Sequence, residues 1–378
     1  MPAHQIVPLL LRWFSRNARV LPWRRTRNPY AIWVSEIMLQ QTQVNTVVPF
    51  WRKWMREMPT IQALAKASPE KLHKLWEGLG YYTRVRNLQK AAQLVLLNHG
   101  GRFPRDYAEV LGLPGIGPYT AGAICSIAFG QPTPVLDGNV TRVLARLFAI
   151  GGNPRVTKVN RRLWRLAAEL VNYAVVCKGS RRPDAGKPDR TPRSPRGGFC
   201  SELNQALMEL GALVCTARNP RCHRCPLAGL CQARKAGRVH LLPSPYKRPS
   251  IVPRHYVAFL LERDGRFLVR QRPSDVVNGQ LWEFPNVELN PGREDVVEAA
   301  LNELAIPAVK LIPLGSLKHS ITRHRITLDA FRVSLPPQRR LAAKLGRWVS
   351  RLQLERLPFT SAHRKLVGRL EEILSGAP

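Results

Sequence analysis

The first part of the chain carries the hydrophobic spacing of amphipathic helices. Between residues 6 and 170, apolar side chains recur at every third or fourth position, most clearly in 30–55 and 71–99. Gly and Pro interrupt this spacing in three short segments, "GGRFP", "LPGIGP" and "FGQPTP". The helical spacing returns in 201–214. We therefore expect an all-α region.

Beyond residue 251 the pattern changes from helix-like to strand-like. Residues 255–272 form two apolar runs around Asp264 and Gly265, a dipeptide typical of tight hairpin turns. Two more strand-like runs and one helical run follow, at 281–289, 325–335 and 293–306. This order predicts an α+β domain from about 252 to 372.

Two polar segments divide the chain. Residues 178–198 contain many Arg, Pro and Gly and almost no apolar side chain, so burial cannot offset their ordering entropy, and we predict a disordered insertion. A chain of 378 residues also exceeds one ordinary core. The predicted organisation is a helical domain, a cysteine loop, a linker rich in Pro and basic residues, and the second domain, at 1–214, 215–232, 233–251 and 252–372.

The charge balance indicates a globular protein that has a polyanionic partner. The chain has 59 Lys and Arg against 25 Asp and Glu, a formal net charge of +34. Most of this charge must lie on the surface, where it repels itself unless a polyanion is bound, which favours a nucleic acid partner. The alternative is a compositional bias without a specific partner.

No segment of the sequence predicts export or membrane insertion. The apolar run near the N-terminus is interrupted by Arg12 and Arg16 and is not followed by a small-residue cleavage site, so it predicts an amphipathic helix. No apolar run has the length of a membrane span. We therefore expect a cytoplasmic protein, nucleoid-associated if it is bacterial, and a monomer, since no oligomer seam is visible. A reducing compartment disfavours disulfides among the seven cysteines.

Four of the seven cysteines lie close together in the segment "CTARNPRCHRCPLAGLC". They are separated by six, two and five residues, and are Cys215, Cys222, Cys225 and Cys231. Zinc sites usually pair two C-x-x-C knuckles, whereas this segment has one, so the spacing favours an iron–sulfur cluster and leaves zinc as the alternative. The other three cysteines are interpreted as core or incidental thiols.

This spacing after an all-α region resembles the cluster loop of the endonuclease III superfamily of DNA glycosylases. The resemblance implies a structural [4Fe–4S] cluster held by the four cysteines. It also implies a basic loop that faces DNA, with Arg218, Arg221, His223 and Arg224 at the positions of such contacts.

The segment "LPGIGPYTAGAICSIAF" predicts a Gly-rich turn that leads into a helix. Gly115 and Gly117 allow close backbone approach, and Pro118 suits the first turn of a helix whose N–H groups can bind a phosphate. Glycines that simply let helices pack are the alternative. Together with the cysteine loop, the segment resembles the helix–hairpin–helix of the same superfamily.

Two carboxylates are candidate catalytic groups. Asp137 is well placed as a helix N-cap, where the helix N-terminus favours its ionised form. Glu36 belongs to a helical run and would ordinarily lie at the edge of a solvated face; if it is buried instead, its raised pKa would make it a general acid.

The surrounding sequence "WVSEIMLQQTQV" resembles the MutY-type adenine DNA glycosylases. The resemblance implies that Glu36 protonates adenine and that Asp137 stabilises, or covalently captures, the oxocarbenium-like sugar. Endonuclease III-like enzymes have a nucleophilic Lys at the position of Tyr119. A phenol cannot form an imine, so the resemblance implies hydrolysis without lyase activity, with Tyr119 and Asn139 orienting the sugar and water.

The same resemblance implies further contacts with DNA. Trp23, Arg24 and Gln205 would lie near the adenine pocket, while Gln41, Thr42, Leu79 and Tyr81 would enter the duplex around the opposing base. Ordinary core packing is the alternative for Leu79 and Tyr81. The rival functions are an endonuclease III-like pyrimidine glycosylase with lyase activity and a lesion sensor without catalysis.

The second domain resembles the Nudix-like, or MutT-like, domain of the MutY family. Glu303 is the only carboxylate near the end of the helix that would hold magnesium, which argues against pyrophosphate hydrolysis. The resemblance implies recognition of double-stranded DNA in which 8-oxoguanine, or guanine, lies opposite adenine. Relatives use a Phe-Ser-His turn for this contact, and here Ile321, Thr322 and Arg323 stand in its place, followed by His324.

Overall fold

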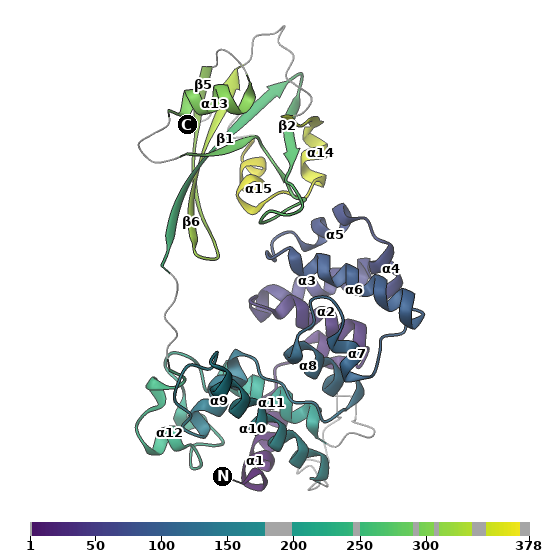
Figure 1. Ribbon diagram of the computed structural model, residues 1–378, viewed down its shortest axis with the longest axis vertical. Helices are drawn as coiled ribbons and strands as arrows, with labels where there is room; N and C mark the ends of the chain where they lie inside the picture. The colour runs from purple at the N-terminus through teal and green to yellow at the C-terminus, as the bar shows by residue number, and fades with distance from the viewer. Residues whose placement is uncertain are drawn as a thin grey trace. The chain divides into compact units, whose positions relative to one another are not determined.

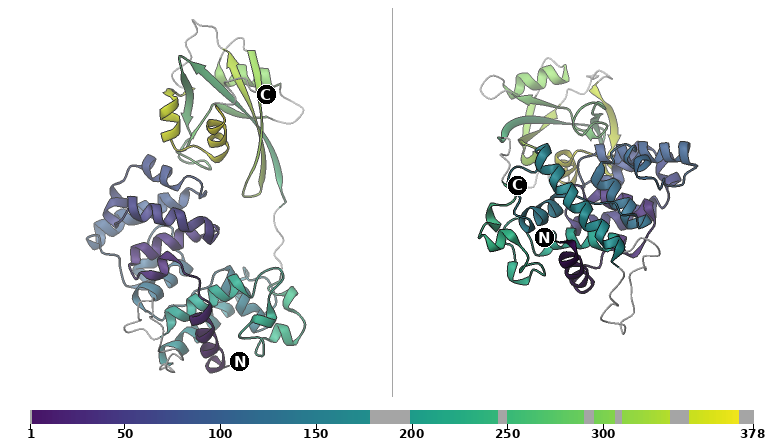
Figure 2. Two further views of the ribbon diagram at one scale, coloured as in Figure 1. Left: turned by 180° about the vertical axis from the view of Figure 1, so that it is seen from behind. Right: turned by 60° about the horizontal axis from the view of Figure 1, so that its bottom comes forward.

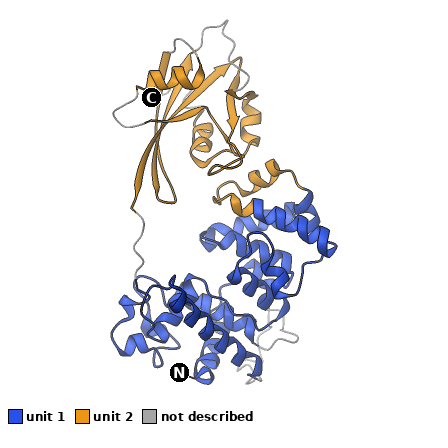
Figure 3. Cartoon of the chain, viewed as in Figure 1, with its two compact units in different colours: residues 1–66, 86–247 blue, residues 67–85, 248–378 orange. Residues whose placement is uncertain are grey.

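The computed structural model divides into two units, each built from segments that are distant in sequence. It describes residues 2–177, 199–244, 250–289, 295–305, 310–334 and 345–370. The first unit comprises 1–66 and 86–247, and the second comprises 67–85 and 248–378 (Figure 3). The predicted disordered insertion at 178–198 lies outside the described residues. The predicted linker is described only in part.

The first unit is helical, as the hydrophobic spacing predicts (Figure 1). Its α-helices are α1 (Ala3–Asn17), α2 (Pro29–Leu39), α3 (Val44–Glu57), α4 (Ile61–Lys66), most of α6 (Thr83–His99), α7 (Tyr107–Leu111), α8 (Pro118–Phe129), α9 (Gly138–Leu147), α10 (Thr157–Val176), α11 (Cys200–Leu213) and α12 (Gln232–Lys235). Three short 3₁₀-helices are η1 (Pro22–Arg25), η2 (Cys222–Arg224) and η3 (Val239–Leu241). No described helix is long and apolar enough to cross a membrane.

One core of this unit forms where α1, α9, α10 and α11 meet, and Figure 2 shows these helices from two further sides. It contains Leu10, Val143, Leu170 and Leu207, all at most 2% exposed. Leu227 of the cysteine loop joins the same core, so the loop is packed onto the helices. Phe199 N–H donates a 3.2 Å hydrogen bond to Ala174 O, which places the start of α11 beside the last turns of α10.

Each of the two long helical runs seen in the sequence is divided by a loop. The run at 30–55 breaks between α2 and α3, and the run at 71–99 breaks between α5 (Pro69–Trp76) and α6. Gln41 and Tyr81 have φ of 59° and 48° in these loops, a conformation that ends a right-handed helix. The candidate DNA-contact residues Gln41, Thr42, Leu79 and Tyr81 therefore lie on loops rather than within helices.

The second unit is built on a mixed sheet. Its strands are β1 (Val252–Arg263), β2 (Arg266–Gln271), β3 (Trp282–Glu283), β4 (Asn286–Leu289), β5 (Lys310–Ile321), β6 (His324–Ser334) and β7 (Arg347–Ser350). The principal order is β3-β2-β1-β6-β5, with β1 and β6 parallel. The predicted hairpin at Asp264 and Gly265 is confirmed, because Arg263 pairs with Arg266.

Helices cover both faces of this sheet. Helix α13 (Val296–Leu304) packs on one face, and α14 (Arg351–Arg356) and α15 (Ser361–Gly368) pack on the other. Strands β5 and β6 form a long hairpin whose turn contains Thr322, which has φ of 51°. Such a φ is uncommon for a β-branched residue, so the hairpin tip is conformationally strained.

Candidate active site

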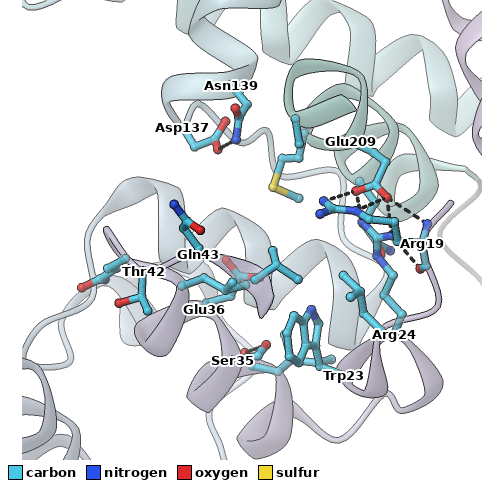
Figure 4. Close-up of a pocket in the computed structure, with 18 of the residues that line it drawn as sticks. Arg19, Trp23, Arg24, Ser35, Glu36, Thr42, Gln43, Asp137, Asn139 and Glu209 are labelled. Atoms are coloured by element: carbon cyan, nitrogen blue, oxygen red, sulfur yellow. Dashed lines mark hydrogen bonds and ion pairs between the residues drawn. The ribbon is translucent and has the colours of Figure 1, made fainter. Parts of the chain in front are cut away.

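A cavity of about 770 Å³ opens in the first unit where α2, α8, α9 and α11 converge (Figure 4). It brings together residues that are far apart in sequence. The candidate residues that line it are Trp23, Arg24, Glu36, Gln41, Thr42, Tyr119, Asp137, Asn139 and Gln205. The two carboxylates therefore face one cavity, which argues against two unrelated solvent-exposed groups.

Glu36 is buried, not at the edge of a solvated face. It is 4% exposed, because α2 is covered on nearly every side and packs against α8. Burial raises the pKa of Glu36 to about 7, and the nearby Asp137 acts in the same direction. A hydrogen bond from Tyr119 opposes the shift. At neutral pH the buried Glu36 can therefore hold a proton that it could donate to a group in the cavity.

Tyr119 is the direct partner of Glu36. Its hydroxyl donates a 2.7 Å hydrogen bond to Glu36 Oε2 and lies 3.4 Å from Met208 Sδ. Burial, together with the two neighbouring carboxylates, holds the pKa of Tyr119 well above its ordinary value. The phenol consequently stays protonated and occupies Oε2, which leaves Oε1 of Glu36 for a transferable proton.

Asp137 is both an N-cap and a cavity residue. Oδ1 accepts from Val140 N–H at 2.7 Å, which caps α9, and Oδ2 accepts from Asn139 Nδ2 at 2.9 Å. The helix N-terminus was expected to favour the ionised form. The hydrogen bonds do so, but burial outweighs them and raises the pKa of Asp137 above its ordinary value.

Asn139 links the cavity to the cysteine loop through Arg142. Arg142 Nη2 donates to Asn139 Oδ1 at 2.8 Å, and Arg142 Nε donates to Cys215 O at 2.6 Å. A continuous series of hydrogen bonds thus runs from the Asp137 carboxylate to the first cysteine of the loop. Gly211 is required beside it, because a Cβ there would lie 2.6 Å from Asn139 Cβ.

The cavity residues missed by the sequence analysis include Arg19, Met208 and Glu209. Glu209, whose side chain is 1% exposed, accepts hydrogen bonds from both Arg19 and Arg24 at 2.8–3.2 Å (Figure 4). Burial alone would raise the pKa of Glu209, but the two guanidinium groups outweigh it and lower the pKa to about 2. Glu209 follows Gln205 by one helical turn, and that spacing was the available signal.

The four clustered cysteines fit an iron–sulfur cluster. Arg146, 2% exposed, donates to Thr216 O at 2.7 Å and approaches Cys215 Sγ at 3.5 Å, so the loop is anchored to α9. Among the described residues, no three His, Cys, Asp or Glu side chains could hold a single metal ion. The loop supplies four cysteine thiolates, which is the donor set of a [4Fe–4S] cluster. Cys125 and Cys200 are buried elsewhere.

The structure places the remaining candidates outside the cavity. Arg218, Arg221, His223 and Arg224 are exposed on the cysteine loop. Gly115 has φ of 79° and contacts Asn87, so a side chain is excluded there, while the Cβ position of Gly117 faces open space. In the second unit, Leu79 is 5% exposed and Tyr81 47%, and Thr322 and Arg323 are exposed at the hairpin tip.

Glu303 does not lie in an open carboxylate site. Its carboxylate accepts a hydrogen bond from Arg270, which also pairs with the buried Glu283. Arg272 pairs with Glu283 as well. Arginine cations therefore already neutralise these carboxylates, which supports the expectation that this helix holds no magnesium.

Comparison with known proteins identifies both parts of the chain. Residues 34–169 match the HhH-GPD superfamily base excision DNA repair proteins, 215–231 match the iron-sulfur binding domain of endonuclease III, and 256–369 match the NUDIX domain. These matches confirm the predicted fold class: a helix–hairpin–helix domain with an iron–sulfur loop, followed by a Nudix-like domain. They also confirm the [4Fe–4S] cluster as the expected cofactor.

Individual relatives extend over most of the chain. The adenine DNA glycosylase of Homo sapiens is 37% identical over 94% of this chain and 72% of its own length. That of Buchnera aphidicola subsp. Baizongia pistaciae is 36% identical over 73% of this chain and 72% of its own length. A solved thermostable thymine-DNA glycosylase, 29% identical, superimposes with a TM-score of 0.51 over 62% of this chain and 97% of its own.

Proposed function

The chain belongs to the adenine DNA glycosylases of base excision repair, and from this we propose that it removes adenine paired with 8-oxoguanine or guanine, with Glu36 and Asp137 as its catalytic carboxylates. The observation that carries the proposal is the burial of Glu36 in a cavity shared with Asp137. Two carboxylates at one site, one of them with a raised pKa, are the usual arrangement for glycosidic bond cleavage.

Glu36 is the general acid. The target adenine leaves the base stack, because its glycosidic bond is inaccessible within the duplex, and enters the cavity. Glu36 then transfers its proton to a ring nitrogen, so that adenine departs as a neutral base. Its pKa of about 7 suits this step, since a large fraction of Glu36 carries its proton at neutral pH and a group with this pKa is still a useful acid.

Asp137 stabilises the positive charge that develops on the sugar, or captures it covalently, before water completes the hydrolysis. Its hydrogen bond from Asn139 fixes the orientation of the carboxylate. Tyr119 occupies the place of the nucleophilic Lys of lyases, and its hydroxyl is engaged by Glu36. The reaction therefore ends at an abasic site with both strands intact.

DNA is held outside the cavity by backbone and wedge contacts. The N-terminus of α8 follows Gly117, whose open surroundings leave room for a phosphate. In the first unit, Gln41 and Thr42 at the cavity rim are the candidates for contact with the opposing base. In the second unit, Tyr81 is 47% exposed and is the candidate wedge, whereas Leu79 is 5% exposed and packs inside the protein. Exposed basic residues of the cysteine loop, Arg218, Arg221, His223 and Arg224, add phosphate contacts.

The [4Fe–4S] cluster would be held by Cys215, Cys222, Cys225 and Cys231. When bound, it cross-links a loop that has little regular structure of its own. The contacts of Arg142 and Arg146 with the loop connect that support to α9, which begins at Asp137.

The second unit reads the base opposite adenine. Thr322 and Arg323 take the places of Ser and His in the family's turn. Arg323 can donate hydrogen bonds from the exposed hairpin tip, whereas Thr322 Oγ1 donates its proton to Ile321 O at 2.7 Å and offers an acceptor. The strained φ of Thr322 is typical of a functional position. A preference for 8-oxoguanine over guanine is the expected result.

The test is release of free adenine from duplexes with adenine opposite 8-oxoguanine or guanine, with half of each sample heated in alkali. We expect release from both, faster from the 8-oxoguanine duplex, and strand breaks only after alkali. Strand breaks without alkali would contradict the hydrolytic assignment. Glu36→Gln is expected to bind DNA with unchanged affinity but to lose about 10²–10⁴-fold in excision rate.

A further inference from the structure

The loop at residues 78–82, here named the wedge loop, is held rigidly although it carries an exposed aromatic side chain. Trp76 Nε1 donates to Gly80 O at 3.1 Å, and Arg84 donates to Leu79 O and Gly80 O at 2.8 Å and 3.0 Å. Tyr81 is 47% exposed at a φ of 48°. Such strain persists only when surrounding contacts enforce it, so the outward presentation of Tyr81 is built into the loop.

Glu77, which immediately precedes the wedge loop, joins it to the C-terminal part of the second unit. Its Oε1 accepts from Arg364 Nε at 2.7 Å and from Phe359 N–H at 3.1 Å, and its Oε2 accepts from Lys74 Nζ at 2.8 Å. The side chains of Glu77 and Arg364 are only 17% and 25% exposed. Lys74 and Arg364 both donate to Leu357 O as well.

Arg364 connects this contact to the hairpin that carries residues 322–323. It belongs to α15, whose Leu366 packs in one hydrophobic cluster with Leu317 and Leu328. Leu317 lies on β5 and Leu328 on β6, the two strands of that hairpin. The wedge loop and the hairpin therefore belong to one compact unit, coloured as such in Figure 3, and Glu77 is the carboxylate at their connection.

We propose that Glu77 is a positioning residue that couples the wedge loop to the hairpin tip, so that contact with the opposing base governs how the wedge loop enters the duplex. The inference rests on the proposed function, since it requires the tip to distinguish 8-oxoguanine from guanine. Loss of the Glu77 contacts leaves the catalytic cavity intact. It therefore reduces discrimination between the two duplexes rather than catalysis itself.

The experiment compares single-turnover adenine excision from the 8-oxoguanine and guanine duplexes by the full-length, cluster-loaded enzyme. The variants are Glu77→Gln, Arg364→Gln and their combination. Glu70→Gln on the exposed first turn of α5 and Arg356→Gln on the exposed face of α14 are matched controls of the same charge change. Melting temperature and cluster absorbance establish that each variant is folded.

We expect each single variant to lower the ratio of the two excision rates by roughly tenfold, mainly through the 8-oxoguanine duplex, while the controls keep the wild-type ratio. The combined variant loses no more than either single variant, because both remove the same contact. A wild-type ratio in folded Glu77→Gln would refute the coupling alone. Equal rates on both duplexes for the wild-type enzyme would instead refute the proposed preference for 8-oxoguanine, and the coupling with it.

Discussion

The hydroxyl of Tyr119 donates a hydrogen bond of 2.7 Å to Oε2 of Glu36. The two residues come from different helices and are 83 positions apart in the chain. The bond lowers a pKa that burial raises, so it sets the acidity of the proposed proton donor. A phenol at this position therefore does more than replace a nucleophilic lysine.

Tyr119→Phe is expected to shift the pH dependence of excision towards alkaline pH. Removing the hydrogen bond removes an interaction that favours ionised Glu36, so the pKa of Glu36 rises above about 7. The alkaline limb of the single-turnover rate profile, which reports loss of the Glu36 proton, then moves to higher pH. Rate profiles between pH 5 and 9 measure the shift. An unchanged alkaline limb would show that Tyr119 does not affect the pKa of the catalytic acid.

Glu36→Gln is expected to stabilise the fold at alkaline pH. The folded-state pKa of Glu36 is about 7 against an ordinary value of 4.5. Between these values Glu36 ionises in the unfolded chain while the buried group stays protonated, so the wild-type protein loses stability as pH rises through that window. The loss amounts to about 3 kcal/mol above pH 7. Urea unfolding at pH 5 and pH 8 should show the variant gaining stability only at pH 8. An equal gain at both pH values would contradict a titration effect.

Arg142→Met is expected to lower the excision rate by about 10- to 100-fold, the usual range for residues that orient an active group through another side chain. Arg142 holds Asn139, which holds Asp137, and the same guanidinium binds Cys215 O. The cluster absorbance should persist, since Arg142 contributes no ligand. Arg161→Met, on the exposed face of α10, is the matched control. Loss of cluster together with loss of rate would indicate a structural role only.

Glu209→Gln is expected to destabilise the first unit by about 3–5 kcal/mol, because it leaves Arg19 and Arg24 without their buried counter-charge. Glu169→Gln removes a carboxylate whose side chain is 59% exposed beside Arg165, and should cost about 0–1 kcal/mol. Chemical denaturation of both variants gives the comparison. Equal and small losses of stability in the two variants would mean that water screens the ion pairs of Glu209 with Arg19 and Arg24.

Turns and motifs that depend on residues close in sequence were predictable, whereas contacts between residues far apart in sequence were not. The turn at Asp264 and Gly265 and the cysteine spacing are short-range signals, and both were confirmed. Strand β5 was not predicted, because its apolar and polar residues alternate only weakly and most of its side chains are exposed. Glu36 is buried because α8 packs against α2. The helical periodicity of α2 does not predict which helix covers it.

Charge networks illustrate the same limit. Arg19 and Glu209 are 190 positions apart, and no pattern in the sequence around either residue predicts that the two form an ion pair. The assignment of residues 67–85 to the second unit was likewise invisible, because their helical spacing matches that of the first unit. The resemblance predicted that Gln205 lies near the adenine pocket, and helical spacing from Gln205 could have indicated Glu209, one turn further along α11.

The hydrogen bond between Phe199 N–H and Ala174 O has a practical consequence. The chain leaves α10 and enters α11 within reach of a single bond, so the number of residues between them is not set by the distance to be spanned. A fluorophore or affinity handle attached between α10 and α11 would leave the residues that line the cavity unchanged.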